Sequence, residues 1–407
     1  MPETRNTGVD SPRAWLIVVA AFFASFVAFG VSYSFGIFLK PLATEFGVSH
    51  AVMSTLFSVL IVLSLFLSPL TGDIADHLGP RPVVAAGALL MGAGLILTAR
   101  VHYFPLVFLT YGLGAGGAVA CVYVPSVAAV GEWFKVHRDI ALGIAISGIG
   151  CGTLVAAPVA AVLIGHYGWR TSFEIYGVLS AALLLVCAAL IAAPPVAKSK
   201  VRSGVMAKIR TPAFARLYAG LFFSGVAIFI SFVYLPEYAI KDGATQVAAA
   251  GLVGYIGASS VIGRLGLNAL APRFGLLSVF QVSFVALLAS YVFWVGGHTY
   301  TSLIWYGIVL GVGYGGIAAM APAVLAQFFG IEGLGELLGV LLTAFGLAAA
   351  AGPPLAGLLI DRTGDLKWPP LLAAASAAGA IVAVIPLRAY GASEAASATE
   401  SAVATAE

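Results

Sequence analysis

The most constraining feature of this sequence is a succession of apolar runs, each about as long as a bilayer is thick. A transmembrane helix needs about 20 predominantly apolar residues, and the chain supplies twelve such segments separated by short polar or basic stretches. Within each run the apolar residues are continuous, without the alternation of a barrel strand. We therefore predict an all-α membrane protein of twelve transmembrane helices, with approximate spans at 14–38, 51–72, 82–100, 104–130, 140–164, 172–193, 213–235, 246–270, 276–296, 301–326, 336–360 and 369–388.

Composition agrees with this prediction and excludes a water-soluble fold. Of 407 residues, 61% are hydrophobic and 9% are charged, and the mean hydropathy is +1.03. A soluble domain carries roughly a quarter charged residues. The first apolar run, from Trp15 to Phe38, is too long for a cleavable signal peptide, so we expect it to remain as the first helix.

The distribution of basic residues predicts the orientation. If the N-terminus is cytoplasmic, thirteen Lys and Arg residues fall on the inside, six on the outside, and Arg264 within a span, which accounts for all 20. Cytoplasmic loops are enriched in Lys and Arg, so we expect a multi-pass protein of the cell (inner or plasma) membrane with both termini inside. The net charge of +3 is then a topology signal and indicates no nucleic-acid partner.

An internal repeat divides the chain into two related halves. Features recur at an offset of 196 or 197 residues, which is typical of two parallel repeats in a membrane carrier. The matching pairs are Gly79 with Gly275, Pro125 with Pro322, Gly143 with Gly339, and Pro158 with Pro354. We predict a cytoplasmic N-terminus (1–13), a six-helix bundle (14–193), a cytoplasmic linker (194–212), a second six-helix bundle (213–390) and a disordered cytoplasmic tail (391–407).

No catalytic or cofactor-binding constellation is visible. The six histidines fall in loops or at helix ends, and there is no phosphate-binding loop, nucleophile elbow or metal-spaced cluster. Cys121, Cys151 and Cys187 lie within predicted spans and suit packing. We therefore expect no enzyme, no cofactor and no metal, and transport driven by gradients rather than by ATP.

A tight loop between the second and third spans carries the first recognisable motif. Its glycines permit a turn, and its charged residues can pair between neighbouring helices. The stretch 72–81 (GDIADHLGPR) resembles the signature loop GxxxDxxGxR of the major facilitator superfamily, with a degenerate copy near 268–275. The resemblance implies a role in structure and gating for Gly72, Asp73, Asp76, Gly79 and Arg81.

The stretch 133–148 (WFKVHRDIALGIAISG) narrows the resemblance. An aromatic pair, a basic cluster and spaced small residues follow in the order seen in the monocarboxylate transporter family and the related oxalate:formate antiporters. Small residues allow close helix contact. By themselves Lys135 and Arg138 suit a positive cytoplasmic loop, and we place them with the gating motif.

Arg264 is the most informative single residue. A guanidinium inside a span costs a few kcal/mol and usually faces a cavity or a partner, and no acidic residue lies at a comparable depth. The cargo can therefore supply the counter-ion, and a carboxylate fits the guanidinium fork. In the alternative interpretation, Arg264 snorkels to the cytoplasmic end of its helix. Two observations weigh against this alternative. The residue that corresponds to Arg264 in the first half is Ser68, so the fold does not need an arginine at this position. Gly257 and Ser260 share the helix face of Arg264 and leave room beside it.

In the resembled families an arginine at this place anchors the substrate carboxylate. The mammalian members have an aspartate where this chain has Ser260 and a lysine where our alignment gives Tyr33. Proton coupling through those groups is therefore open here. The antiporters have a second intramembrane lysine, and the segment 336–360 has none. One cation favours one carboxylate.

Other residues can complete a binding site around Arg264. A buried tyrosine needs a hydrogen-bond partner, and Tyr33, Tyr123 and Tyr314 lie in spans expected to line the cavity. Phe35 can close an apolar wall. For each of these, ordinary packing remains an alternative.

Together these features predict a secondary transporter, functional as a monomer, that moves a small monocarboxylate such as lactate or pyruvate, with a proton, by alternating access. The alternatives are an organic anion exchanger of the oxalate:formate kind, a carrier that exports hydrophobic drugs, and a sensor that binds without transport. Uptake by vesicles distinguishes the last from the others.

Overall fold

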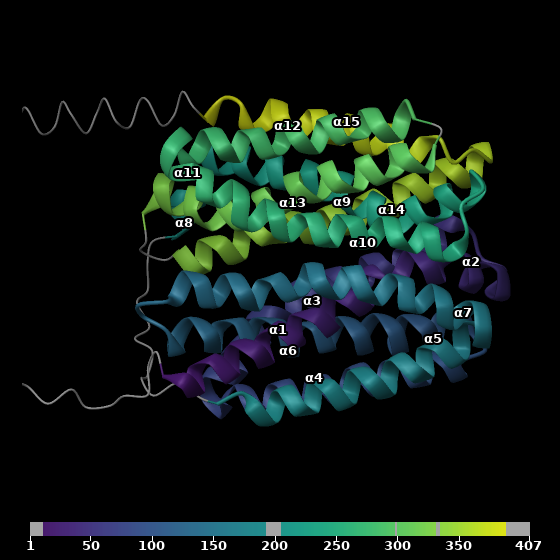
Figure 1. The fold of residues 1–407 in the computed structure, drawn as a ribbon, viewed down its shortest axis with the longest axis horizontal. Helices are drawn as coiled ribbons and strands as arrows, with labels where there is room; N and C mark the ends of the chain where they lie inside the picture. Colours follow the sequence, from purple (N-terminus) through teal and green to yellow (C-terminus); the bar gives the residue numbers. More distant parts are fainter. Residues whose placement is uncertain (1–10, 193–204, 298, 331–333, 388–407) are drawn as a thin grey trace, which may run out of the picture.

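The computed structural model describes residues 11–192, 205–297, 299–330 and 334–387. These residues form a bundle of helices that run side by side along its long axis, and they contain no strand (Figure 1). Only helices satisfy their backbone polar groups within one segment. The predicted linker falls partly, and the predicted tail wholly, outside the described residues. The helices are α1 (Pro12–Tyr33), α2 (Phe35–Phe46), α3 (His50–Leu78), α4 (Pro80–Arg100), α5 (Phe104–Val107), the π-helix η1 (Phe108–Leu113), α6 (Gly114–Trp133), α7 (Arg138–Leu190), α8 (Val205–Ile209), α9 (Pro212–Lys241), α10 (Gln246–Ile262), the π-helix η2 (Gly263–Leu267), α11 (Asn268–Phe274), α12 (Leu276–Val295), α13 (Tyr300–Phe329), α14 (Leu334–Thr363) and α15 (Trp368–Val384).

The helices account for the twelve predicted spans. Within the described residues, ten helical segments are long and apolar enough to cross a membrane. One of them, in α7, is two helices joined at Gly168, whose φ of 76° and ψ of 166° are not helical. The shorter apolar helix α15 supplies the last span. The predicted fold class is confirmed.

Several helices extend beyond their predicted ends. The first predicted span stops at 38, but after a break at Ser34 the chain continues as α2 to Phe46. Likewise α3 continues past 72 to Leu78, and α9 past 235 to Lys241. Hydropathy measures only the apolar part of a helix, whereas the backbone hydrogen bonds continue into the polar turns beyond it. The sequence therefore locates spans better than helix ends.

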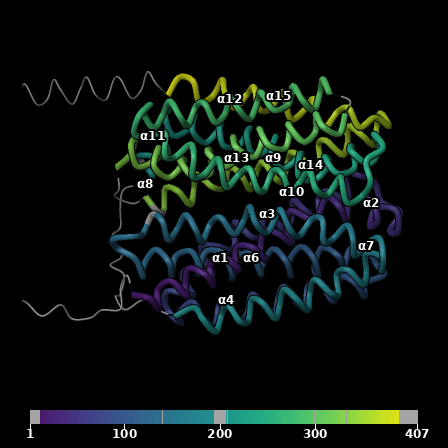
Figure 2. The backbone as a smooth tube through the Cα atoms, in the orientation of Figure 1, coloured from purple at the N-terminus to yellow at the C-terminus, as the bar shows by residue number. Residues whose placement is uncertain are grey.

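The two halves are separate groups of helices, α1–α7 and α9–α15, at the two ends of the colour scale in Figure 2. The repeat extends to the helix bounds, since α3 begins at 50 and α10 at 246, and α4 begins at 80 and α12 at 276, both 196 apart. Glycines with positive φ, which residues with a side chain rarely adopt, recur at the same offset. They are Gly47 and Gly243, Gly79 and Gly275, and Gly168 and Gly364.

Two seams carry most of the contact between the halves. At the first, α7 packs on α10, and a Cβ on Gly150 would lie 2.4 Å from the carbonyl oxygen of Gly257. At the second, α3 packs on α14, and a Cβ on Gly357 would lie 2.6 Å from the nitrogen of Ala51. Glycine removes the Cβ that would keep these backbones apart.

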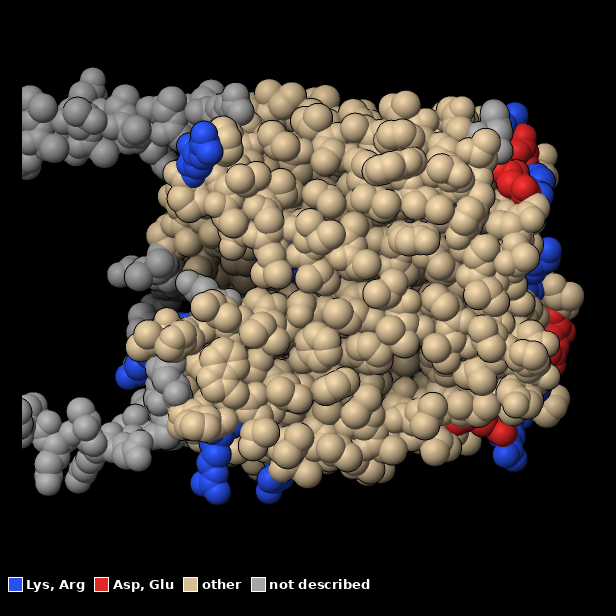
Figure 3. Space-filling model, in the orientation of Figure 1, with Lys and Arg blue, Asp and Glu red and all other residues tan. Residues whose placement is uncertain are grey.

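The bundle has two distinct ends. We call the end where α1 begins at Pro12 and α9 at Pro212 the terminal end, and the end where α3 begins at His50 the distal end. In the space-filling view, charged side chains gather at both ends, and the surface between them is almost wholly uncharged (Figure 3). The same view is hollowed between the halves toward the terminal end.

Candidate functional site

Arg264 lies in η2, the π-helical turn that interrupts α10 and α11. This turn packs tightly on α13: a Cβ on Gly263 would lie 2.2 Å from the oxygen of Val312, and one on Gly315 would lie 2.1 Å from the oxygen of Ser260. A π-turn adds a residue to the helix and rotates the side chains that follow, and such turns are frequent at functional sites. The Arg264 side chain is directed inward, and the residue is 8% exposed. It does not snorkel to solvent.

The guanidinium is only partly satisfied. Nη1 donates to the carbonyl oxygen of Ile146 on α7 at 3.1 Å, and Nη2 donates to the hydroxyl of Tyr314 at 3.4 Å. The guanidinium carbon lies 5.5 Å from the centroid of the Tyr314 ring. Nε is buried and has no hydrogen-bond partner, and no carboxylate among the described residues forms an ion pair with Arg264. A buried charge in this condition is costly, so a ligand anion would relieve it.

The three predicted tyrosines gather around this arginine. Tyr314 contacts it directly, and Tyr33 and Tyr123 lie near Tyr314. Tyr314 comes from the second half, whereas Tyr33 and Tyr123 come from the first. One cation and three tyrosines, drawn from both halves, therefore lie close together.

Two aromatic residues that the sequence did not single out complete this cluster. Phe232 on α9 stacks on Tyr33 with ring centroids 4.2 Å apart and an interplanar angle of 11°. Phe29 on α1 meets the Tyr123 ring edge-on at 4.9 Å. No local signal identifies them, because the sequence has 25 phenylalanines, and those that pack resemble those that line a cavity.

Two predicted binding residues have other surroundings. Phe35 packs against Phe57 and Tyr111 within the first half. The Ser260 hydroxyl donates to the oxygen of Gly257 at 2.7 Å and lies against Gly150 of α7. The room expected beside Arg264 at Gly257 is therefore filled by α7, since the first seam runs along that face.

The motif residues occupy the terminal end. Gly72, Asp73 and Asp76 lie in the last turns of α3, so the turn is reduced to Gly79, whose φ is 87°. Arg81 donates to the carbonyl oxygens of Ala188 and Ala189 near the end of α7, within the first half. Lys135 lies in the loop after α6, and the guanidinium of Arg138 lies against Gly131.

One protein-family model matches most of this chain. The model of the Major Facilitator Superfamily matches residues 21–308 and, again, 267–406. The chain belongs to the major facilitator superfamily. It is a multi-pass membrane protein, and its relatives are transporters rather than enzymes.

Within the superfamily, the resemblance to monocarboxylate transporters is confirmed by similar proteins. Monocarboxylate transporter 13 of Bos taurus is 28% identical over 365 residues, 88% of this chain and 85% of that protein. Monocarboxylate transporter 4 of Mus musculus is 27% identical over 395 residues, 91% of this chain and 82% of that protein.

Solved structures of the superfamily share the fold. A bacterial homologue of the human lysosomal transporter Spinster, in an inward-facing and occupied conformation, has a TM-score of 0.71 at 16% identity, covering 94% of this chain and 96% of that chain. The D323A mutant of the nucleoside transporter NupG has a TM-score of 0.73 at 16% identity, covering 92% of this chain and 99% of that one.

Proposed function

We propose that this protein is a secondary transporter that moves a small monocarboxylate, of the size of lactate or pyruvate, across the membrane by alternating access. The observation that carries the proposal is Arg264, a buried cation with a free Nε and no carboxylate partner among the described residues. A carboxylate can accept two parallel hydrogen bonds from a guanidinium. A single carboxylate would use Nε together with one of the two terminal nitrogens.

The surroundings of Arg264 favour one small acid. Tyr33, Tyr123 and Tyr314 offer hydroxyl groups for the carboxylate or for a 2-hydroxyl or 2-keto oxygen, and Phe29 and Phe232 offer apolar walls. No second cation accompanies Arg264 in the apolar part of α14. Because a second carboxylate would remain unpaired, dicarboxylate exchange is the weaker candidate.

The direction of the molecule in the membrane and its coupling belong to the same proposal. Cytoplasmic termini make the terminal end the inner end, as the excess of basic residues there supports. The hollow toward that end in Figure 3 then supports an inward-open form. Transfer of the acid together with a proton makes the passage electroneutral, and we place the protein in the plasma or inner membrane as a monomer.

Uptake of labelled lactate and pyruvate into proteoliposomes, driven by a proton gradient, tests the proposal. Replacing Arg264→Ala removes the anion's partner, and loss of a buried charge pair commonly costs 2 kcal/mol or more, so uptake efficiency should fall by at least about 30-fold. Arg264→Lys should recover only a part, because Lys lacks the planar fork.

The matched control is Arg210→Ala, which removes an exposed arginine just before the start of α9. It should keep uptake close to the wild-type rate. Unchanged uptake in Arg264→Ala would refute the anchor. Counterflow of a labelled dicarboxylate exceeding that of lactate would favour the exchanger instead.

A further inference from the structure

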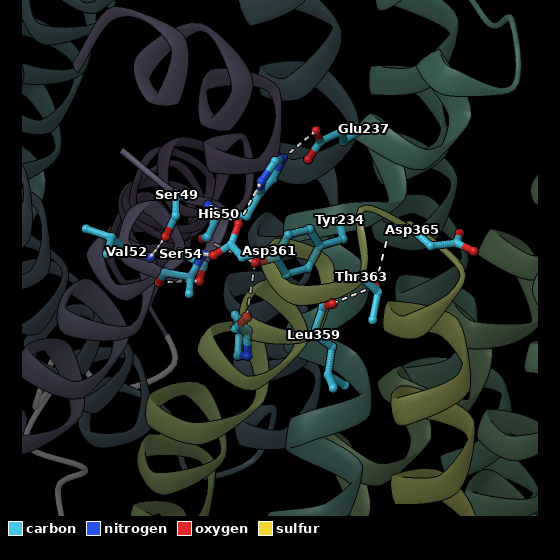
Figure 4. A network of polar contacts seen from close by, with 12 residues as sticks. Ser49, His50, Val52, Ser54, Tyr234, Glu237, Leu359, Asp361, Thr363 and Asp365 are labelled. Carbon is cyan, nitrogen blue, oxygen red and sulfur yellow. Dashed lines mark hydrogen bonds and ion pairs between the residues drawn. The ribbon is translucent and has the colours of Figure 1, made fainter. Parts of the chain in front are cut away.

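The distal end of the second seam carries a polar cluster that the transport site does not use. Figure 4 shows the ring of His50, the first residue of α3, between two carboxylates from the other half. Nε2 lies 3.0 Å from Oε1 of Glu237 on α9, and Nδ1 lies 3.2 Å from Oδ1 of Asp361 on α14. We call these three residues the distal triad.

The distal triad joins the halves at a point where their backbones already touch. Asp361 also accepts hydrogen bonds from the backbone nitrogens of His50 at 3.0 Å and Ala51 at 2.9 Å. Tyr234 of α9 donates to the carbonyl oxygens of Pro353 at 3.0 Å and His50 at 3.4 Å. The first turn of α3 is thus held by the opposite half, which closes this end.

Both ring nitrogens of His50 face acceptors. An ionised carboxylate only accepts hydrogen bonds, and a neutral imidazole has a single N–H, so both contacts are hydrogen bonds only in the imidazolium form. In either neutral tautomer one ring nitrogen would point its lone pair at a carboxylate. The observed geometry is therefore that of protonated His50.

The two carboxylates depend on that proton to different degrees. Asp361 keeps its two backbone donors when His50 is neutral. Glu237 has no such reserve: its side chain is 10% exposed, and Oε2 is buried without a partner. Deprotonation of His50 leaves Glu237 as a nearly buried charge without a counter-ion, which is costly unless the seam parts and admits water.

The groups facing His50 are few. From α9 they are Glu237 and Tyr234, and from α14 Asp361; Ser49 precedes His50 and caps α3. On α2, the neighbouring acid Glu45 is engaged by Arg170 and Trp169. The exposed cations Lys241 and Arg362 lie in the last turns of α9 and α14. The His50 side chain is 33% exposed, so protons reach it from the distal side.

The fold itself does not require the triad. At an offset of 196, His50 corresponds to Gln246, Asp361 to Gly165 and Glu237 to Pro41. The pseudo-symmetric seam between α7 and α10 therefore packs without any ionisable group at these positions. What the second seam has in addition is a histidine between two carboxylates.

We propose that the distal triad is a proton-binding site that closes the distal end when His50 is protonated and releases it when His50 is neutral. The proton enters and leaves from the same side, so the triad senses the pH there and biases the conformational equilibrium without carrying the proton across. The inference uses only the alternating-access part of the proposed function and not the identity of the cargo.

Distance measurements without substrate test it. Spin labels at Tyr167 and Thr301, which are exposed near the distal end on opposite halves, report its opening in the reconstituted full chain with its three cysteines replaced. Between about pH 5.5 and about pH 8, across the usual titration range of histidine, the wild type should shift from the short to the long distance. Linkage to one proton limits the change in the closed-to-open ratio to about tenfold per pH unit.

His50→Gln removes the titrating group and should abolish this shift, whereas His102→Gln, at an exposed histidine of the distal end, should keep it. If His50→Gln does not fold, Glu237→Gln gives the second test: the proton then has one carboxylate fewer to bridge, and the shift should shrink. A wild type without a shift, or an unchanged shift in either triad variant, would overturn the inference. Arg264→Ala should keep the wild-type shift, so the anchor and the triad fail separately.

Discussion

At the scale of single residues, replacing Tyr314, which contacts Arg264, should weaken substrate binding by about the free energy of one hydrogen bond. Tyr314→Phe removes the hydroxyl that accepts from Nη2 but keeps the ring beside the guanidinium. A hydrogen bond to a charged group contributes roughly 1.5–3 kcal/mol, so we expect KM for the transported acid to rise by about tenfold or more, with smaller effects on the maximal rate. Initial uptake rates over a range of substrate concentrations measure this.

The matched control is Tyr176→Phe, which removes another buried tyrosine hydroxyl, bonded to the carbonyl oxygen of Ala156 within the first half. It should leave KM unchanged. Equal effects of the two substitutions would mean that Tyr314 only supports the fold.

Part of the site could be predicted from the sequence for a physical reason. A charge inside an apolar span stands out, and Arg264 directed attention to Tyr314, whose hydroxyl accepts a hydrogen bond from it. Phe29 and Phe232 could not be found, because every face of these spans is apolar and no periodicity separates cavity from lipid. His50 was one of several helix-end histidines, and only the fold brings Glu237 and Asp361 to it.

At the scale of the helix, the close approach of α7 and α10 leads to a test of the first seam. A side chain at position 150 would meet the backbone of Gly257, so Gly150→Leu should disfavour the observed arrangement of the halves. Overpacking costs roughly 1–3 kcal/mol, so uptake should slow by about fivefold or more. Gly165→Leu, on the same helix with nothing within 4 Å, should transport normally. The measurement is the uptake rate of each variant, normalised to the amount of folded protein. Equal rates in the two variants would contradict the prediction.

The kink in α7 gives a second prediction for this scale. Gly168 has a φ of 76° and a ψ of 166°, a conformation that essentially only glycine adopts, and strain there costs of order 1–3 kcal/mol. Gly168→Ala should therefore lower the midpoint of thermal unfolding, while Gly165→Ala should not. Its repeat partner Gly364, with a φ of 69°, should behave like Gly168; stability unaffected by both alanines would contradict the strain argument.

The elements also show where sequence reasoning stops. Apolar length predicted each span, and the offset of 196 residues even matches the helix starts. The π-turn around Arg264 was not predicted. It packs closely on the neighbouring helix at two glycines, Gly263 in the turn and Gly315 opposite it. Such packing depends on the neighbouring helix α13 rather than on local sequence.

At the scale of the whole molecule, alternating access requires the second seam to part at its distal end. Ser58 of α3 bonds to the carbonyl oxygen of Ala349 of α14 at 2.5 Å, across the halves. In a chain without its native cysteines, Ser58→Cys with Ala349→Cys should form a disulfide on oxidation that stops uptake, and reduction should restore it. Each single cysteine variant should be insensitive to the oxidant. Transport that continues in the cross-linked protein would contradict movement at this seam.

The carboxylate of Asp361 is a helix cap supplied by the opposite half, since it accepts from the first two amides of α3. The first turn of a helix has no intrahelical partners for these groups, so each opening leaves them to water. Deuterium should then enter at the amides of His50 and Ala51 at a rate set by the open population, while amides deeper in α3 stay protected. Two backbone hydrogens would thus serve as a native clock for the transport cycle, without any label on the protein.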